Sequence, residues 1–218
     1  MQVFKRLSVV SGMVRPGAAV RGLALVLALL ALSVQARAEE LGAPQQVVAE
    51  VTEQVLAVVR EQGAKLDSEP EAFFAAIEEV LAPVVAFDFI ARGVMGNYAK
   101  EASEEQRKRF SEVFQQDLVS TYARGLAIYS ANPITVDPGS DAQQGQRRVS
   151  VIQRVKTDAG EHVLAYTMGL DRNDNRWKLL NVVINGVNLG NTFRSQFAQA
   201  MQKSGDLDSV IEGWGRNG

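Results

Sequence analysis

The sequence predicts an α+β fold in which helices pack on one face of an antiparallel sheet. Apolar residues recur at helical spacing through residues 44–129. Three later runs, 147–156, 162–170 and 177–184, are rich in β-branched and aromatic residues and are separated by hairpin-type loops. The chain then returns to helical patterns over 187–214. This order, in which helices are followed by a meander of about four strands and then by further helices, is typical of the α+β class.

Residues 1–38 are predicted to be a cleavable export signal. A basic leader precedes thirteen uncharged residues, 22–34, and Ala36-Arg37-Ala38 supplies the small residues of a cleavage site after Ala38. A membrane-spanning helix would need about 20 apolar residues, and a buried core helix would not account for the basic leader. No Cys follows the cleavage site, so a lipid anchor cannot be attached there. We therefore expect one domain, residues 39–218, released outside the cytoplasm.

The composition of this mature chain disfavours several classes of function. Removal of residues 1–38 takes five of the 23 basic residues and leaves 18 against 25 acidic ones, a formal charge of −7. A general binder of nucleic acid or anionic membranes needs clustered positive charge instead. The chain has no Cys and one His, so it lacks the ligands of a zinc site and we expect no metal. That histidine, His162, is predicted to face solvent on a strand rather than to act as a catalytic base.

Three helices are predicted in the first part of the domain. Valines at helical spacing mark residues 44–61 as the first. Apolar residues at the same spacing predict a second helix over 69–85, with Pro70 in its first turn and Pro83 expected to kink or end it. The third, 87–98, is short and interrupted by two glycines.

The longest predicted helix runs from Ser103 to about residue 129. Ser103 and Gln106 have the spacing of a capping box. Apolar residues then share one face for about seven turns, and the opposite face is polar. Asn132-Pro133 ends the helix.

The predicted strands carry apolar residues on both faces, and residues 134–136 are a candidate for an added edge strand. Strict alternation in the third strand assigns its apolar residues to two faces: Trp177, Leu179 and Val183 on one, and Leu180, Val182 and Ile184 on the other. Such a strand is either covered on both faces, which is the simpler interpretation, or faces a cavity on one. Helices over 187–203 and 206–214, separated by Gly205, complete the domain.

The residues alone do not identify a reaction. The sequence has no nucleophile elbow, phosphate-binding loop, cluster of metal ligands or Ser/His/Asp set. Asp88, between Phe87 and Phe89, is the only acid in a strongly apolar setting and could be a general acid or base. A carboxylate at a helix terminus is the commoner use of Asp. The residue patterns alone therefore predict an exported α+β domain with more apolar surface than its own core needs.

Two segments resemble a known family. One contains Leu81-Ala82-Pro83, Phe87-Asp88-Phe89, Met95-Gly96 and Ser103-x-x-Gln106; the other contains Trp177-Lys178-Leu179, Asn185-Gly186-Val187 and Phe193-Arg194-Ser195-Gln196-Phe197. In order and spacing they resemble the MlaC/toluene-tolerance family of periplasmic phospholipid-binding proteins, over roughly residues 47–214. Two positions depart from the family pattern: Asn181 stands where the family usually has Asp, and Asn188 where it usually has Ser. Asn caps a helix about as well as Ser does, so the fold is not threatened.

The resemblance implies that the helices and a curved antiparallel sheet enclose a deep apolar cavity for acyl chains, with the phospholipid headgroup near its mouth. It implies a carrier without catalytic activity that shuttles phospholipid between an outer-membrane lipoprotein complex and an inner-membrane ABC transporter complex, maintaining outer-membrane lipid asymmetry. A periplasmic monomer is expected, with phospholipid as cargo and no cofactor. Each buried methylene is worth about 0.8 kcal/mol. To compete with a bilayer, the cavity must therefore keep nearly all of both acyl chains away from water.

The side chains expected to line such a cavity are apolar or aromatic, because these form a wall without polar cost and Met adapts to varied chains. They are Tyr98, Phe110, Phe114, Leu118, Tyr122, Val151, Tyr166, Met168, Trp177, Leu179 and Val183.

Two other classes of function stay open. A small exported α+β enzyme could act on an apolar substrate in a cone-shaped pocket with Asp88 or a Tyr, although the sequence offers no second polar catalytic partner. A periplasmic interaction or chaperone module would expose an apolar patch and enclose no cavity.

Overall fold

The computed structural model describes residues 43–140, 143 and 145–215, all within the unit Leu41–Gly218. The predicted signal peptide, residues 1–38, and its cleavage site after Ala38 lie outside the described residues. None of the helices in the described ranges is long and apolar enough to cross a membrane.

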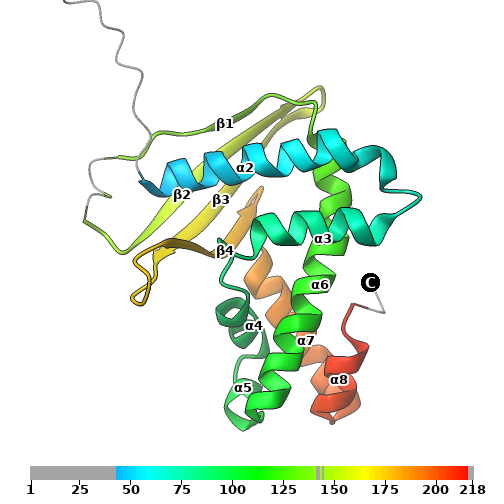
Figure 1. The fold of residues 1–218 in the computed structure, drawn as a ribbon. Coiled ribbons are helices and arrows are strands. Elements are labelled where there is room, and N and C mark those ends of the chain that lie inside the picture. Colours follow the sequence, from blue (N-terminus) through cyan, green and yellow to red (C-terminus); the bar gives the residue numbers. More distant parts are fainter. Residues whose placement is uncertain (1–42, 141–142, 144, 216–218) are drawn as a thin grey trace, which may run out of the picture. The chain divides into compact units, whose positions relative to one another are not determined.

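The described part of the chain has the predicted α+β fold, with seven α-helices and a five-stranded sheet. The helical elements before the sheet are α2 (Ala43–Gln62), the 3₁₀ turn η1 (Gly63–Lys65), α3 (Pro70–Leu81), α4 (Phe87–Met95), α5 (Tyr98–Glu101) and α6 (Glu104–Tyr129). The helices after it are α7 (Leu189–Ser204) and α8 (Leu207–Gly213). Figure 1 shows the long helix α6 running among the other helices, with α2 crossing one face of the sheet.

Local signals set the helix boundaries. α3 ends at Leu81, four residues earlier than predicted, because Pro83 has no N–H with which to continue a helix. The third predicted helix, 87–98, ends earlier, as α4 at Met95, because Gly96 adopts a φ of +60° there; a separate short helix, α5, begins at Tyr98. The predicted capping box precedes α6: the Gln106 N–H donates to Ser103 Oγ at 3.1 Å, and the Ser103 N–H donates to Gln106 Oε1 at 2.9 Å.

The strands form a meander in the order β1-β2-β3-β4-β5, and each neighbouring pair is antiparallel. They are β1 (Ile134–Val136), β2 (Arg148–Thr157), β3 (Gly160–Leu170), β4 (Trp177–Ile184) and β5 (Val187–Asn188). The predicted edge strand is present as β1. The fifth strand arises because residues 187–188, predicted to begin a helix, pair with β4. Asn185 and Gly186, both with positive φ, form the two-residue turn between β4 and β5.

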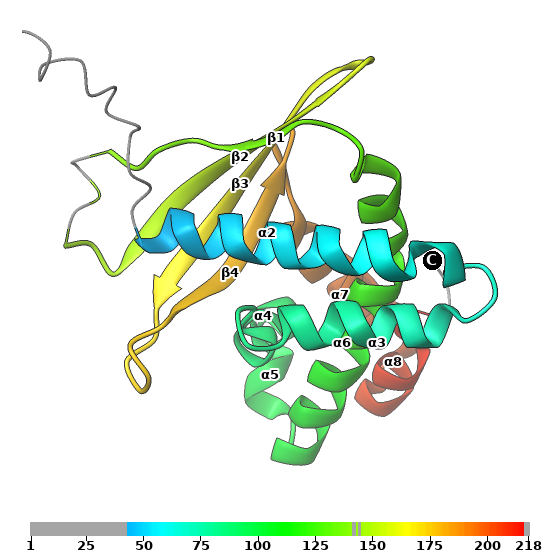
Figure 2. The ribbon, with the colours of Figure 1, turned by 45° about the horizontal axis from the view of Figure 1, so that its top comes forward.

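One face of the sheet packs under α2 and is termed the α2 face. On this face Val149 and Val151 of β2 lie opposite Met168 and Tyr166 of β3. The first three pack with Val48 of α2 in one buried cluster. Figure 2 shows α2 lying across the strands from a second direction. The predicted packing of helices on a sheet is therefore present.

A bulge in β4 changes which of its side chains reach the α2 face. Thr167 of β3 pairs with Asn181, whereas the next residue of β3 pairs with Leu179, so Leu180 is an extra residue in β4. The extra residue reverses the alternation along the strand. Leu179 lies on the α2 face and Val183 on the opposite face, so the prediction that these two side chains share a face is wrong.

The helices form two further cores beside the sheet. α4, α6, α7 and α8 pack around Phe110, Phe114 and Phe197, while α2, α3 and α6 pack around Phe73 and Ile77. All five of these side chains are fully buried. Because α6 contributes to both cores, it joins the two groups of helices.

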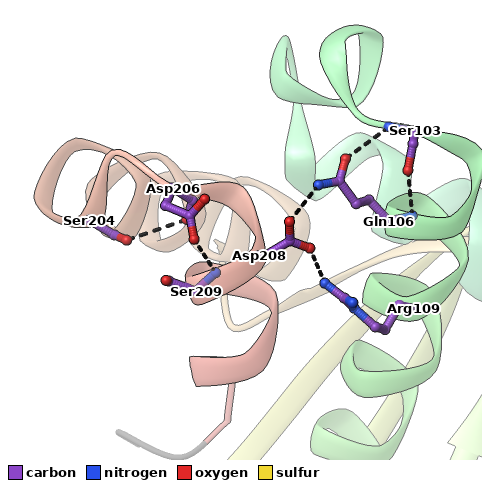
Figure 3. A network of polar contacts seen from close by, with 7 residues as sticks. All are labelled: Ser103, Gln106, Arg109, Ser204, Asp206, Asp208 and Ser209. Atoms are coloured by element: carbon purple, nitrogen blue, oxygen red, sulfur yellow. Dashed lines mark hydrogen bonds and ion pairs between the residues drawn. The ribbon is translucent and has the colours of Figure 1, made fainter.

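Polar contacts hold the edges of this helical layer. The Ala86 N–H, between α3 and α4, donates to the Leu179 carbonyl of β4 at 3.0 Å. At the other end, Asp208 of α8 accepts a 3.0 Å hydrogen bond from Gln106 Nε2 and forms an ion pair with Arg109, both on the first turns of α6 (Figure 3). The first contact anchors the helices to the sheet, and the second anchors α8 to α6.

Candidate functional site

A cavity of about 610 Å³ lies between α2, the helices α3, α4 and α6, the α2 face of the sheet and the first turns of α7. This volume is in the range of roughly 300–1,000 Å³ that is typical of small-molecule sites. Among the described residues that line the cavity, none is Asp, Glu, Lys or Arg. The site can therefore bury apolar groups, and its described residues offer a ligand no carboxylate, ammonium or guanidinium.

The two walls of the cavity differ in polarity. Helices α3, α4 and α6 contribute side chains such as Ile77, Phe87 and Ile90, and Tyr122 is the one polar side chain that this wall adds among the described residues. The other polar lining residues come from α2, the sheet and its β4–β5 turn: Thr52, Gln153, His162, Tyr166, Asn181 and Asn185. Hydrogen-bonding capacity is therefore concentrated on the sheet side.

Six of the eleven side chains predicted to line a lipid cavity lie at its wall. They are Phe114, Leu118, Tyr122, Tyr166, Met168 and Leu179. The other five lie outside the described lining: Tyr98, Phe110, Val151, Trp177 and Val183. Contact of any of the eleven with lipid stays a prediction.

Tyr98 and Phe110 belong to the helix core. The Phe110 ring centroid lies 4.9 Å from that of Phe197 and 5.3 Å from that of Trp214. The Tyr98 ring packs on Phe197 at 6.0 Å. The apolar stripe of α6 has different neighbours along its length. Its first part packs on α7 and α8, and its later part borders the cavity.

The packing and register of the sheet explain the positions of the remaining three side chains. Val151 is buried between α2 and the sheet, in the cluster that contains Val48, and Trp177 packs against that cluster. The bulge in β4 puts Val183 on the face opposite α2. These three positions follow from strand register rather than from side-chain size.

Part of the cavity lining was not predicted from the sequence. Val51 and Val55 of α2 line the cavity, and the valine stripe of that helix was the signal that could have identified them. The prediction that His162 faces solvent is wrong, because His162 pairs with Val155 across the strands and lines the cavity, half-buried. Its Nδ1 lies 2.9 Å from Asn185 Nδ2. Only the strand register could have placed this side chain.

A chain of hydrogen bonds crosses the sheet side of the cavity. The Tyr166 hydroxyl donates to Gln153 Oε1 at 2.8 Å, Gln153 Nε2 donates to Thr52 Oγ1 at 2.7 Å, and Thr52 Oγ1 donates to the Val48 carbonyl at 2.7 Å. Burial raises the pKa of Tyr166 above its usual range, so its hydroxyl stays protonated and can donate. No pattern in the sequence indicated this network.

Tyr122, on the opposite wall, is also kept protonated. Burial, and then the negative charge of Asp117 nearby on α6, raise the pKa of the Tyr122 hydroxyl. Neither cavity tyrosine therefore supplies a phenolate near neutral pH.

The two positions that depart from the family pattern both support the start of α7. Asn188 is its N-cap, with Oδ1 accepting from the Asn191 N–H at 3.1 Å. Asn181 Oδ1, from β4, accepts from the Gly190 N–H at 3.1 Å. A Cβ at Gly190 would lie 2.7 Å from that oxygen, so a larger residue there would displace the Asn181 side chain from this contact.

Asp88 lies away from the cavity lining. It is exposed in the first turn of α4 and accepts a 2.6 Å hydrogen bond from Ser111 Oγ of α6. The use of this acid at a helix terminus, which the sequence favoured, is confirmed.

Comparisons with known proteins place this geometry in context. The family model described as MlaC protein matches residues 49–216. The toluene tolerance protein ttg2D of Pseudomonas putida is 38% identical over 174 residues, which are 78% of this chain and 79% of that protein. The intermembrane phospholipid transport system binding protein MlaC of Haemophilus influenzae is 22% identical over 173 residues, 77% of this chain and 78% of that protein. A solved structure of a phospholipid-binding protein from Ralstonia solanacearum, in complex with a phospholipid, superposes with a TM-score of 0.70 at 23% identity, covering 78% of this chain and 94% of that one.

Proposed function

The chain belongs to the MlaC family, and we propose that it is a periplasmic carrier that holds a phospholipid in its cavity without chemically changing it. The observation that carries this proposal is the cavity, whose described lining contains no Asp, Glu, Lys or Arg. Acyl chains need such a wall, because each buried methylene contributes about 0.8 kcal/mol and a charge facing them would be desolvated at high cost.

The acyl chains are expected to contact the predicted side chains that lie at the wall. On the helix side these are Phe114, Leu118 and Tyr122; on the sheet side they are Tyr166, Met168 and Leu179. Aromatic rings supply broad rigid surfaces and Met168 supplies a flexible one, so chains of different length and unsaturation can be accommodated.

The transport role rests on the relatives. The name of the Haemophilus influenzae protein refers to intermembrane phospholipid transport. By this relationship the chain would shuttle phospholipid between an outer-membrane lipoprotein complex and an inner-membrane ABC transporter complex, and so maintain outer-membrane lipid asymmetry. It would act as a monomer comprising residues 39–218, after cleavage following Ala38, with phospholipid as cargo and no cofactor.

The alternative of a small exported enzyme is less well supported. Asp88, its candidate acid or base, lies outside the described cavity lining and is bonded to Ser111. His162 lines the cavity with its Nδ1 2.9 Å from Asn185 Nδ2, and none of the described lining residues is Asp, Glu, Lys or Arg. Among the described lining residues, a proton-transfer mechanism would therefore find no charged second group.

Lipid extraction tests the proposal directly. The full chain is produced in a Gram-negative host, purified without detergent and extracted with organic solvent, and the extract is analysed by mass spectrometry. A carrier should release phospholipid in near-stoichiometric amount, because a dry cavity retains its cargo through purification. A protein that yields no phospholipid, and that binds none from vesicles afterwards, would contradict the proposal.

A further inference from the structure

The hydrogen bonds on the sheet side of the cavity have a fixed direction. Thr52 has one hydroxyl proton, and it is given to the Val48 carbonyl at 2.7 Å. Thr52 Oγ1 can therefore only accept from Gln153, so the amide nitrogen of Gln153 faces Thr52 and its oxygen faces Tyr166. The Tyr166 hydroxyl then donates to that oxygen. The network therefore determines which end of the Gln153 side-chain amide is the oxygen and which is the nitrogen.

This arrangement leaves one hydrogen-bond donor of Gln153 without a partner. The side-chain amide has two N–H groups, and one of them is used by Thr52. Among the described residues no second acceptor is bonded to Gln153 Nε2. Gln153 is 4% exposed and lines the cavity. A hydrocarbon chain packed against this donor would leave it unsatisfied, which disfavours a purely apolar neighbour.

We propose that Gln153 donates its second N–H to an acyl ester carbonyl of the bound phospholipid, and that the carrier consequently prefers ester-linked over ether-linked lipids. This inference rests on the proposed carrier function. Ester carbonyls are neutral acceptors that every diacyl glycerophospholipid carries where its chains begin, whereas an ether-linked lipid of the same length has no carbonyl there. The phosphate suits the site less well, because the described lining offers no cation to balance its charge.

The network also makes Gln153 a pre-organised donor. Its backbone is held in β2 between two neighbouring strands, through pairing with Val136 of β1 and Leu164 of β3. Its amide is held at both ends, by Tyr166 and by Thr52. Little side-chain entropy remains to be lost when a carbonyl binds, so the contact can discriminate between lipids that differ only in the carbonyl oxygens of their chain linkages.

The test uses delipidated protein produced from the full chain. Two phosphatidylglycerols with saturated chains of equal length, one diester and one diether, are titrated against the wild type and Gln153→Met. The wild type is expected to bind the diester about tenfold more tightly, since a lost hydrogen bond with an unsatisfied buried donor has an effect of that order. Gln153→Met keeps the volume but has no donor, so it should bind both lipids equally.

Gln45→Met is the matched control. Gln45 is also a buried glutamine, 3% exposed, but it is bonded to Gln143 and does not line the cavity. The same substitution there should keep the full preference for the diester. A loss of preference in this control would show that the effect at Gln153 is indirect, which overturns the inference.

A second measurement does not depend on the variant folding. The carbonyl stretch of a ¹³C-ester-labelled lipid bound to wild type should lie at the lower frequency of a hydrogen-bonded ester, and an unshifted band would overturn the inference. Equal binding of diester and diether by the wild type, or a preference that survives Gln153→Met, would overturn it as well while leaving the carrier function intact. Failure of both lipids to bind would instead contradict the carrier function.

Discussion

Leu179 and Val183 show how a single residue decides what a strand presents to the cavity. Both are aliphatic, both are half-buried and they lie four positions apart on β4. The bulge at Leu180 separates them, so that only Leu179 lines the cavity. Substituting the same charge at the two sites therefore isolates the effect of facing the cavity.

We predict that Leu179→Glu stays folded but purifies without phospholipid. An unpaired carboxylate among acyl chains costs several kcal/mol, enough to weaken binding by about 10³-fold or more. Val183→Glu is the control and should keep its lipid, because its side chain points away from the cavity. Circular dichroism checks folding and mass spectrometry checks lipid content. Normal lipid in folded Leu179→Glu would show that the acyl chains do not reach this position.

Met168 is a less selective site for the same experiment. It lines the cavity, but it is 1% exposed and packed in a core cluster with Val149 and Val151. A charge there would disturb stability and lipid binding together.

Asp88 is predicted to be dispensable for lipid binding. It is exposed, lies outside the described cavity lining and accepts its hydrogen bond from Ser111. Asp88→Asn can still accept that bond, so the melting temperature and lipid content should be close to those of the wild type. Ser111→Ala, which removes the donor, should behave similarly in lipid content. If Asp88→Asn kept its lipid but lost all function in cells, an enzymatic role for this acid would be favoured.

At the scale of elements, capping residues decide where the last helices begin. Asn188 caps α7, and Asp206 caps α8 by accepting from the Ser209 N–H at 2.8 Å (Figure 3). α8 then reaches α6 through Asp208, which binds Gln106 and Arg109. The docking of the C-terminal helix thus depends on carboxylates at its first turn.

The Asp206 cap should make the stability of α8 depend on pH. Hydrogen bonds from the Ser209 side chain and then from its backbone lower the pKa of Asp206 below its ordinary value of 3.8. A lowered pKa contributes stability that is present above the unfolded value and is lost as the pH falls through the folded value. Asp206→Ala should therefore lower the melting temperature at pH 7, and this difference should shrink below about pH 4.

Thermal melts monitored by circular dichroism between pH 7 and pH 3 measure this effect. Asp158→Ala, at an exposed position in the β2–β3 turn, is the matched control and should leave the melting temperature unchanged at every pH. A destabilisation by Asp206→Ala that persists undiminished at pH 3 would mean that the carboxylate charge is not what stabilises the cap.

At the scale of the whole molecule, we expect the fold to need neither a disulfide nor a metal ion. The sequence has no Cys, and the described residues contain no group of His, Asp and Glu side chains able to hold a metal ion. We predict that neither EDTA nor dithiothreitol changes the melting temperature, because we expect neither a metal ion nor a disulfide to contribute to folding. Differential scanning calorimetry provides the measurement, and a decrease of several degrees in EDTA would reveal a structural metal.

The class of fold and the order of its elements were predictable because their signals are local. The capping box of Ser103 and Gln106 and the helix end before Pro83 each involve residues within one turn of each other. The alternation in β2 likewise depends only on successive residues of one strand. Such patterns act before any tertiary contact forms, so the sequence by itself determined them.

The wall of the cavity was decided by contacts between residues far apart in the chain. Phe110 and Phe114 lie one turn apart on the same stripe of α6, but α7 and α8 enclose Phe110 while Phe114 also reaches the cavity. Gln153 became a cavity residue only through register with β3 and the passage of α2 above it. Periodicity specifies which face of an element is apolar. Whether a side chain or an open space lies against that face depends on distant elements, and only the tertiary structure brings those together.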